Sequence, residues 1–369
     1  MTGRWIPARQ GRASPLPTAF VASRPKTVPC AARAAPLPFD RFPMTRRTLA
    51  FAAVLGAALA VPAHAAGGKI KDLKEPAWSW EGVFGRYDQA QLQRGYQVYA
   101  QVCSSCHSME LVAFRHLGEE GAPYHLEECP EELGLPSSVD CSDPAANPYV
   151  KAIAAEYQIP VIDDVGDTAE RPGLPSDYFP SPYANRQQAI VANGGAYPPD
   201  QSLIVKSRVK GRNYIYSLLT GYPGGPNYPG GGEDVPSVLD VPAGQYYNPY
   251  YPGDTASLID PAYMDEEGHP HKEDILARTY EGLVTDDGIL YGGAFKMAAP
   301  LQDGIVTYED GSPETIDQYA KDVVAFLQWS SEPKLEQRKT MGQFVVIYLV
   351  IFAFIVYLSY RKIWSNVEH

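Results

Sequence analysis

The clearest amphipathic pattern in the first half of the chain lies in residues 88–102. Asp88 is a good N-cap for a helix at this position. Gly95 is a poor helix former, so it either allows a second helix to approach closely or is simply tolerated. Apolar side chains recur at i, i+4 and i+7, the spacing of one helix face, at Leu92, Tyr96 and Tyr99. The pattern predicts a helix with one buried face.

A second amphipathic stretch covers residues 313–329. Ser312 is a good N-cap, Pro313 suits the first helical position, and Glu314 is favoured at the positive end of the helix dipole. The apolar stripe consists of Ile316, Ala320, Val323, Val324 and Leu327. One early and one late helix of this kind predict a mainly α domain in which the two helices cross.

A continuous apolar run follows at residues 342–360, with no formal charge in 19 residues. At about 1.5 Å per residue it spans roughly 28 Å, close to the hydrocarbon thickness of a bilayer. A buried core helix could be equally apolar, but basic pairs flank this run and it ends nine residues before the C-terminus. The pattern predicts a transmembrane anchor over residues 339–362 and a short tail at residues 363–369.

The N-terminal 65 residues have the composition of segments that are removed. Residues 44–65 combine a basic start, an apolar stretch and Ala63-His64-Ala65 as a cleavage site, which together predict a signal peptide. Residues 1–43 are rich in Arg and Pro and form a doubtful leader. They come either from a start assigned upstream of Met44 or, as the second choice, from a mitochondrial presequence.

Export of the chain sets its expected location. The signal peptide predicts that residues 66–338 form a domain in the bacterial periplasm, anchored in the inner membrane, with residues 363–369 in the cytoplasm. A mitochondrial inner membrane is the second choice.

The middle of the chain is rich in turn formers. Gly and Pro together make up 66 of 369 residues, well above the average of about 12%, and 25 tyrosines accompany them. Short helices are expected at residues 185–193 and 202–208, a turn region at 221–232, and an acidic insertion at 254–287. These features predict a loop-rich domain with insertions that wraps around something, and not a regular bundle or sheet.

The charge is strongly acidic. Removal of residues 1–65 takes away nine basic residues and one acidic residue, so the formal net charge of −12 becomes −20. Such a surface repels nucleic acid and suits a basic protein partner.

The run Cys103-Ser104-Ser105-Cys106-His107 carries the most specific chemistry. A C-x-x-C-H motif is typical of c-type haem attachment, in which the two thiols form thioethers and the histidine supplies an iron ligand. A zinc site would need two further ligands at matching spacing, which the sequence does not offer. A thioredoxin-like site would need a βαβ context, which the flanks do not supply. The motif predicts one covalently bound haem c.

A second axial ligand on the iron must come from elsewhere in the chain. Met109 is too close to His107 to reach the opposite face of a haem. Met297 lies among small residues and before Pro300, which suits close approach of the backbone to a ring. On spacing alone, a methionine is more often part of a core than an iron ligand. The other candidates are His116, His125, Met264, His269 and His271.

Two cysteines remain after the leader and the haem motif are set aside. Cys129 and Cys141 lie within one loop rich in Pro and Glu. In an oxidising compartment such a pair is expected to form a disulfide; the alternative is two free, buried thiols.

These elements in this order resemble the cytochrome c1 family, the haem subunits of ubiquinol–cytochrome c oxidoreductase. The resemblance extends from about Trp78 to Trp364. Besides the helix with Ala325-Phe326-Leu327-Gln328-Trp329 and the single tail span, it rests on the haem-motif segment 98–109 and on four further segments, residues 193–200, 214–222, 246–253 and 306–313.

The resemblance implies a fold, a ligand set and partners. It implies a cytochrome c-type haem domain in which Cys103 and Cys106 are the thioether positions, His107 the proximal ligand and Met297 the distal ligand. It places Arg208 and Tyr214 at the haem propionates and Asn193 near the haem edge. Electrons would arrive from a Rieske iron–sulfur subunit and leave to a soluble, basic cytochrome c, with cytochrome b beside the tail helix.

The chain also departs from the family pattern. About residues 254–291 intervene between the segment at 246–253 and the methionine segment, and the Cys129–Cys141 loop is extra. Two other functions remain open on the sequence: a membrane-anchored cytochrome of another oxidase or reductase, and a haem sensor or peroxidase with a displaceable ligand.

Overall fold

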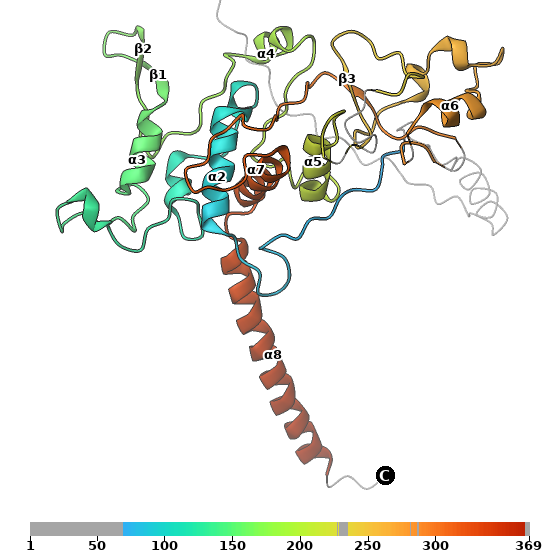
Figure 1. Ribbon diagram of the computed structural model, residues 1–369. Helices are drawn as coiled ribbons and strands as arrows, with labels where there is room; N and C mark the ends of the chain where they lie inside the picture. Colours follow the sequence, from blue (N-terminus) through green and yellow to red (C-terminus); the bar gives the residue numbers. More distant parts are fainter. Residues whose placement is uncertain (1–68, 227, 229–234, 281, 286–287, 366–369) are drawn as a thin grey trace, which may run out of the picture. The chain divides into compact units, whose positions relative to one another are not determined.

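The computed structural model describes residues 69–365 except 227, 229–234, 281 and 286–287. The predicted leader and signal peptide, and most of the predicted tail, lie outside this part of the chain. The helices are α2 (Gln89–Gln101), α3 (Pro148–Ala155), α4 (Arg186–Ala192), α5 (Gly211–Thr220), α6 (Lys272–Arg278), α7 (Ile316–Ser331) and α8 (Leu335–Trp364). The strands are β1 (Gln158–Ile162), β2 (Thr168–Pro172), β3 (Tyr246–Asn248) and β4 (Gly293–Phe295). The prediction of a mainly α, loop-rich fold is confirmed (Figure 1).

Helices α2 and α7 form the centre of the core and cross at Gly95. A Cβ atom at this position would lie 2.1 Å from the backbone oxygen of Asp322. Gly95 therefore permits the close approach of a second helix, which was one of its two interpretations. The rings of Tyr96 and Tyr99 on α2 pack on Phe326 of α7, each at 5.7 Å between centroids.

The start of α7 differs from the predicted start. Thr315, not Ser312, is the N-cap, and its hydroxyl accepts a hydrogen bond from the Gln318 backbone N–H. The Ser312 side chain donates instead to Asp310. The predicted cap is wrong by three residues because Ser312 is used in a local turn with the neighbouring acid.

The short helix predicted at residues 202–208 is also wrong, since this stretch forms consecutive turns. Helix α5 follows it and begins directly after Lys210, whose φ of +49° lies in the left-handed region. Gly211 then packs so tightly that a Cβ atom would lie 1.7 Å from the Val205 backbone oxygen. The expected helix at 185–193 is confirmed as α4, capped by the Asn185 side chain.

The two small sheets each have two antiparallel strands, β1 with β2 and β3 with β4. The second pairing joins Tyr246 to Phe295 and Asn248 to Gly293 across the acidic insertion. The insertion holds α6, and its residues Ile259 and Ile275 form a small apolar cluster with Leu290 and with Val238, which precedes the insertion. It therefore leaves and rejoins the domain at one point, beside the methionine segment.

The extra cysteine loop is closed by the predicted disulfide between Cys129 and Cys141. The loop contains a short 3₁₀ turn at Glu131–Leu133, and the two glutamates of this turn, Glu131 and Glu132, are exposed.

Helix α8 is long and apolar enough to cross a membrane, and its most apolar window is not buried against the rest of the chain. It begins at Leu335, before the predicted anchor starts at residue 339. Its first turn is fixed to the domain: Leu335 is buried, and Glu336 accepts a hydrogen bond from the Tyr87 backbone N–H at 2.8 Å.

Candidate haem site

The C-x-x-C-H motif follows α2 directly. Residues Cys103–Ser105 form a 3₁₀ turn, and the backbone N–H groups of Cys106 and His107 both donate to the Cys103 carbonyl. The two cysteines are not bridged to each other. Burial raises the pKa of the Cys103 thiol to about 12, and the neighbouring Cys106 acts in the same direction. Both sulfurs thus lie on one tight turn at the edge of the core.

The His107 imidazole is oriented by a distant carbonyl. Its Nδ1 lies 2.8 Å from the backbone oxygen of Pro199. A neutral imidazole that donates from Nδ1 keeps its lone pair on Nε2, the atom available to a metal. Burial lowers the pKa of His107, which favours this neutral form.

The Pro199 carbonyl is itself fixed by its neighbour Asp200. One oxygen of the Asp200 carboxylate accepts hydrogen bonds from the Ser108 hydroxyl and the Glu110 backbone N–H, both at 2.9 Å. The other oxygen accepts from the Ser202 backbone N–H. Asp200 therefore ties the segment after the haem motif to the loop that orients His107. Pro199 and Asp200 had no predicted role; their only signal in the sequence was their place in the segment 193–200 that resembles the family.

Met297 follows β4 in a backbone that is held on both sides. The Tyr222 hydroxyl donates to the Met297 carbonyl at 2.9 Å. The Phe295 ring stacks on Tyr251 at 4.5 Å and lies 5.9 Å from the Tyr222 ring. The Met297 side chain is half-buried. Its main chain is thus positioned by aromatic packing.

One loop connects the surroundings of His107 and Met297. It begins at Asn193 and Gly194, where a Cβ atom on Gly194 would lie 3.9 Å from the side chain of Lys296. It ends at Pro199, whose carbonyl meets His107. Gly194 and Gly195 have φ of +60° and +95°, a conformation that favours glycine. This seven-residue segment therefore runs from the side chain next to Met297 to the carbonyl that meets His107.

The Asn193 amide caps helix α4. Its Nδ2 donates to the Ala189 carbonyl at 2.7 Å and to the Tyr183 hydroxyl at 3.0 Å. The predicted edge residue thus holds the start of the connecting loop.

Arg208 and Tyr214 lie within electrostatic range of each other. Burial raises the pKa of Tyr214, and the positive charge of Arg208 opposes this shift. Tyr251, which stacks on Phe295, also acts on the Tyr214 pKa. The pair therefore lies next to the aromatic residues that hold the Met297 segment. In the described part of the chain, the Arg208 guanidinium donates only to Ser207.

The rival axial ligands are occupied elsewhere. Met109 is fully buried in the main core, and Met264 packs on the apolar cluster of the insertion. The His116 Nδ1 accepts from the Ala113 backbone N–H at 3.0 Å. The His125 Nδ1 lies 3.1 Å from the Gly118 carbonyl, and His269 pairs with Asp265. Each of these side chains has a structural explanation. His271, the remaining candidate, is exposed at the start of α6, and Met297 stays the predicted ligand.

The residues present fit a haem better than a bare metal ion. Within the residues that the structure describes, no group of three or more His, Cys, Asp or Glu side chains could hold a metal ion. A cavity of about 150 Å³ opens beside Cys106 and is lined also by Tyr183, Arg186 and Tyr197. This volume is below the usual range of about 300–1,000 Å³ for ligand pockets. A group held here by covalent bonds needs no such enclosure.

Comparisons with known proteins agree with this chemistry. A model of the Cytochrome C1 family matches residues 78–367. A cytochrome c1 of Rhodospirillum rubrum is 38% identical, over 80% of this chain and 89% of the relative. A mitochondrial cytochrome c1 haem protein of Solanum tuberosum is 39% identical, over 78% of this chain and 68% of the relative. A protein of Bradyrhizobium diazoefficiens named cytochrome b/c1 is 39% identical, and the match spans 35% of its length.

Proposed function

This chain belongs to the cytochrome C1 family, and we propose on that basis that it is the haem subunit of a cytochrome bc1 complex. In this role it passes single electrons from a Rieske iron–sulfur subunit to a soluble, basic cytochrome c, with cytochrome b beside α8. Proteins of this family are haem proteins, and the chain carries one covalently bound haem c. The observation that carries the proposal is the family match across residues 78–367, which includes the haem motif.

We assign the thioether bonds to Cys103 and Cys106 and the axial bonds to His107 and Met297. The bound haem supplies a couple that gains and loses one electron. The Pro199 carbonyl accepts the Nδ1 proton of His107, which makes the other nitrogen a stronger ligand. The Met297 thioether is a soft, neutral ligand that favours the ferrous state and raises the potential. With His107 and Met297 as its ligands, the haem would supply electron transfer and not oxygen chemistry.

Arg208 and Tyr214 are assigned to the haem propionates, and Asn193 to the haem edge. An exposed guanidinium with donors to spare, near a half-buried phenol, is a fitting partner for carboxylates. The Asn193 amide is already bound to Ala189 and Tyr183, so we assign it a positioning role for the loop that ends at Pro199.

The location follows from the two terminal segments. We propose a bacterial inner membrane, with the haem domain in the periplasm, α8 as the single span and the tail in the cytoplasm; a mitochondrial inner membrane is the second choice. The homologues include both bacterial and mitochondrial proteins. N-terminal sequencing of the purified protein should give Ala66 as the first residue, and an N-terminus at residue 1 or 44 would contradict this processing.

Purification from membranes tests the proposed function. The chain should co-isolate with a two-haem cytochrome b and a Rieske centre, and its reduced spectrum should not change with carbon monoxide. A chain isolated with a different oxidase or reductase would contradict its place in a bc1 complex. A spectrum altered by carbon monoxide would instead indicate a displaceable ligand, as in a sensor or peroxidase.

A further inference from the structure

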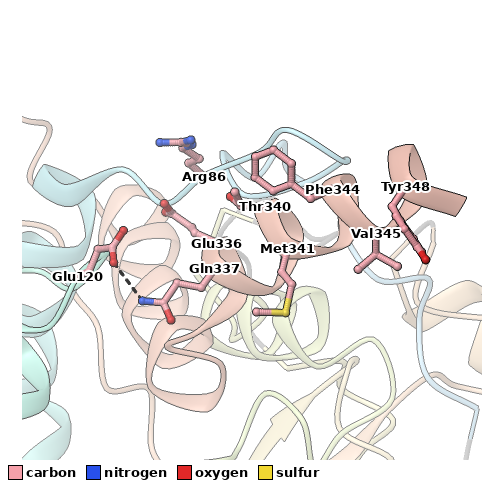
Figure 2. Close-up of a pocket in the computed structure, with 9 residues that line it drawn as sticks. All are labelled: Arg86, Glu120, Glu336, Gln337, Thr340, Met341, Phe344, Val345 and Tyr348. Atoms are coloured by element: carbon pink, nitrogen blue, oxygen red, sulfur yellow. Dashed lines mark hydrogen bonds between the residues drawn. The ribbon is translucent and has the colours of Figure 1, made fainter. Parts of the chain in front are cut away.

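A cavity of about 550 Å³ lies where the haem domain meets α8, away from the haem motif. Figure 2 shows that two of its residues, Arg86 and Glu120, come from loops outside the helix, while the others succeed one another along α8. The residues from the helix are Glu336, Gln337, Thr340, Met341, Phe344, Val345 and Tyr348. The lining therefore changes from polar to apolar along the helix.

Both loops are fastened to α8, so the cavity has fixed walls. On one side, Lys339 donates to the Gly85 carbonyl at 3.0 Å and Gln343 donates to the Val83 carbonyl at 3.1 Å. On the other side, the Gln337 amide donates to Glu120 at 3.2 Å (Figure 2). A salt bridge from Lys334 to Glu119 supports the same wall at 2.6 Å.

The cavity lies along α8 at the level where the headgroups of a bilayer would meet its acyl chains. Glu336 lies six residues before the uncharged run begins at residue 342, which is about 9 Å along a helix. Tyr348 lies about the same distance into that run. The polar end thus falls at the level of lipid headgroups and the apolar end at the level of acyl chains.

The loop beside the cavity also presents apolar side chains to its surroundings. Phe84 is 82% exposed and Val83 is 63% exposed, although they lie next to the first turns of α8. Exposed aromatic and aliphatic residues at this level suit contact with lipid. These side chains would suit lipid at the mouth of the cavity, on a side of α8 that cytochrome b does not cover.

The charges at the polar end select among lipids. Arg86 forms no ion pair or side-chain hydrogen bond with any residue in the described part of the chain. Glu336 and Glu120 each use one carboxylate oxygen, for Tyr87 and Gln337. The lining has one cation and two anions, and Lys339, which interacts electrostatically with Glu336, brings the local formal charge to zero. A site with both signs of charge and no net charge suits a headgroup of the same kind.

We propose that this cavity binds one phospholipid with a phosphate and a primary ammonium in its headgroup, such as phosphatidylethanolamine. The Arg86 guanidinium binds the phosphate, because guanidinium–phosphate hydrogen bonds are charge-assisted. The free carboxylate oxygens of Glu120 and Glu336 accept hydrogen bonds from the ammonium. Phe344, Val345 and Tyr348 line the path of an acyl chain. The lipid then joins the haem domain to its anchor.

Native mass spectrometry of the full-length, haem-loaded chain tests this site. The delipidated protein is mixed separately with phosphatidylethanolamine, phosphatidylglycerol and phosphatidylcholine. We expect one phosphatidylethanolamine per chain, held at least about tenfold more tightly than the other two lipids. Arg86→Gln should weaken its binding by about tenfold, while Arg278→Gln, in the insertion, should have no effect. The haem spectrum of each variant shows that the domain is folded.

A second variant tests the charge argument. Glu336→Gln keeps an acceptor oxygen for the Tyr87 N–H but removes one negative charge, so it should reduce the preference for phosphatidylethanolamine over phosphatidylglycerol. Preference of the native chain for phosphatidylglycerol or phosphatidylcholine would overturn the assignment of the headgroup. Binding that is equal in the native chain and Arg86→Gln would overturn the site. Neither result depends on which electron carriers the protein serves.

Discussion

His107 illustrates, at the scale of single residues, how distant parts of the chain complete a local motif. The two cysteines and the histidine lie within five residues, so their chemistry is visible in the sequence. The acceptor that orients the imidazole is 92 positions away, at Pro199. The type of ligand could therefore be predicted from the sequence, but its orientation could not, because it depends on a long-range contact.

Met297→Leu should lower the reduction potential without preventing haem attachment. The substitution keeps the bulk of the side chain and removes the sulfur, while Cys103 and Cys106 remain. We expect a fall of about 200 mV, within the range of about 0.8 V that axial ligands span. At about 59 mV per tenfold for one electron, the equilibrium shifts by more than three orders of magnitude. Redox titration and covalent haem staining measure both effects.

Met264→Leu is the matched control for this experiment. Met264 packs in the cluster of the insertion, so its replacement should leave the potential unchanged. The Met297 variant should also become reactive to carbon monoxide, because a coordination position opens. If Met264→Leu lowers the potential and Met297→Leu does not, the ligand assignment is wrong.

At the scale of helices and strands, caps and glycines decided which predictions succeeded. Asp88 and Asn185 cap α2 and α4 through hydrogen bonds to the first turn of their own helices, so both helices were predictable. Helix α5 was missed because its start needs a left-handed Lys210 and the tight packing of Gly211 on Val205. Neither property has a signature in a hydrophobic pattern, because both depend on the surrounding chain.

For the candidate site, too, one part could be predicted from the sequence and another part could not. Met297 had rivals in the sequence because spacing alone cannot separate a ligand from a core residue. Packing favours Met297, since Met109 lies in the main core and Met264 packs against a second apolar cluster, and the ligand assignment stays a prediction. The pairing of β3 with β4 also explains why the insertion does not displace the methionine segment.

Gly95→Ala should destabilise the haem domain by separating α2 from α7. The added Cβ would meet the Asp322 carbonyl at 2.1 Å, and backbone cannot move aside easily. Overpacking of this kind costs about 1–3 kcal/mol, and it outweighs the better helix propensity of alanine. Gly342→Ala, at a helical position with no atom within 4 Å, is the control. Chemical denaturation followed by haem absorbance should show a lower midpoint for Gly95→Ala alone; equal midpoints would contradict the crossing.

Loss of the Cys129–Cys141 disulfide should reduce stability but leave haem attachment intact. The bond closes a loop of sequence separation 12, which corresponds to about 3 kcal/mol in the chain-entropy model. The double variant Cys129→Ser with Cys141→Ser should stain normally for covalent haem and unfold at lower denaturant. The native mature protein should show no free thiol when it is denatured without reductant. Two free thiols per chain would rule out the bond.

For the molecule as a whole, the predicted mature charge of −20 should govern the encounter with the electron acceptor. Reduction of a basic cytochrome c should slow as salt rises, because the Debye length falls from about 10 Å at 0.1 M to about 3 Å at 1 M. Stopped-flow measurement of the second-order rate constant tests this. A rate constant that does not change with salt would indicate apolar docking instead.

Two matched pairs of acidic residues test which part of the surface causes the salt dependence of the rate constant. Glu131 and Glu132, on the disulfide loop, are exposed, as are Glu266 and Glu267 on the insertion. Changing the first pair to glutamine should flatten the salt dependence if that loop faces the acceptor. Changing the second pair alters the net charge equally and serves as the control. Equal effects of the two changes would mean that only the overall charge matters.

The pairing of β3 with β4 at the base of the insertion has a practical consequence for building new proteins from this chain. At that base Gly253 and Gly293 are in close backbone contact: a Cβ on Gly253 would lie 2.8 Å from the Gly293 Cα. The two ends of the intervening segment are therefore adjacent, and its length does not determine where the flanking strands lie. A fluorescent reporter or an affinity module could replace the outer part of this segment. This would place the added module next to the Met297 segment and leave both chain termini unchanged.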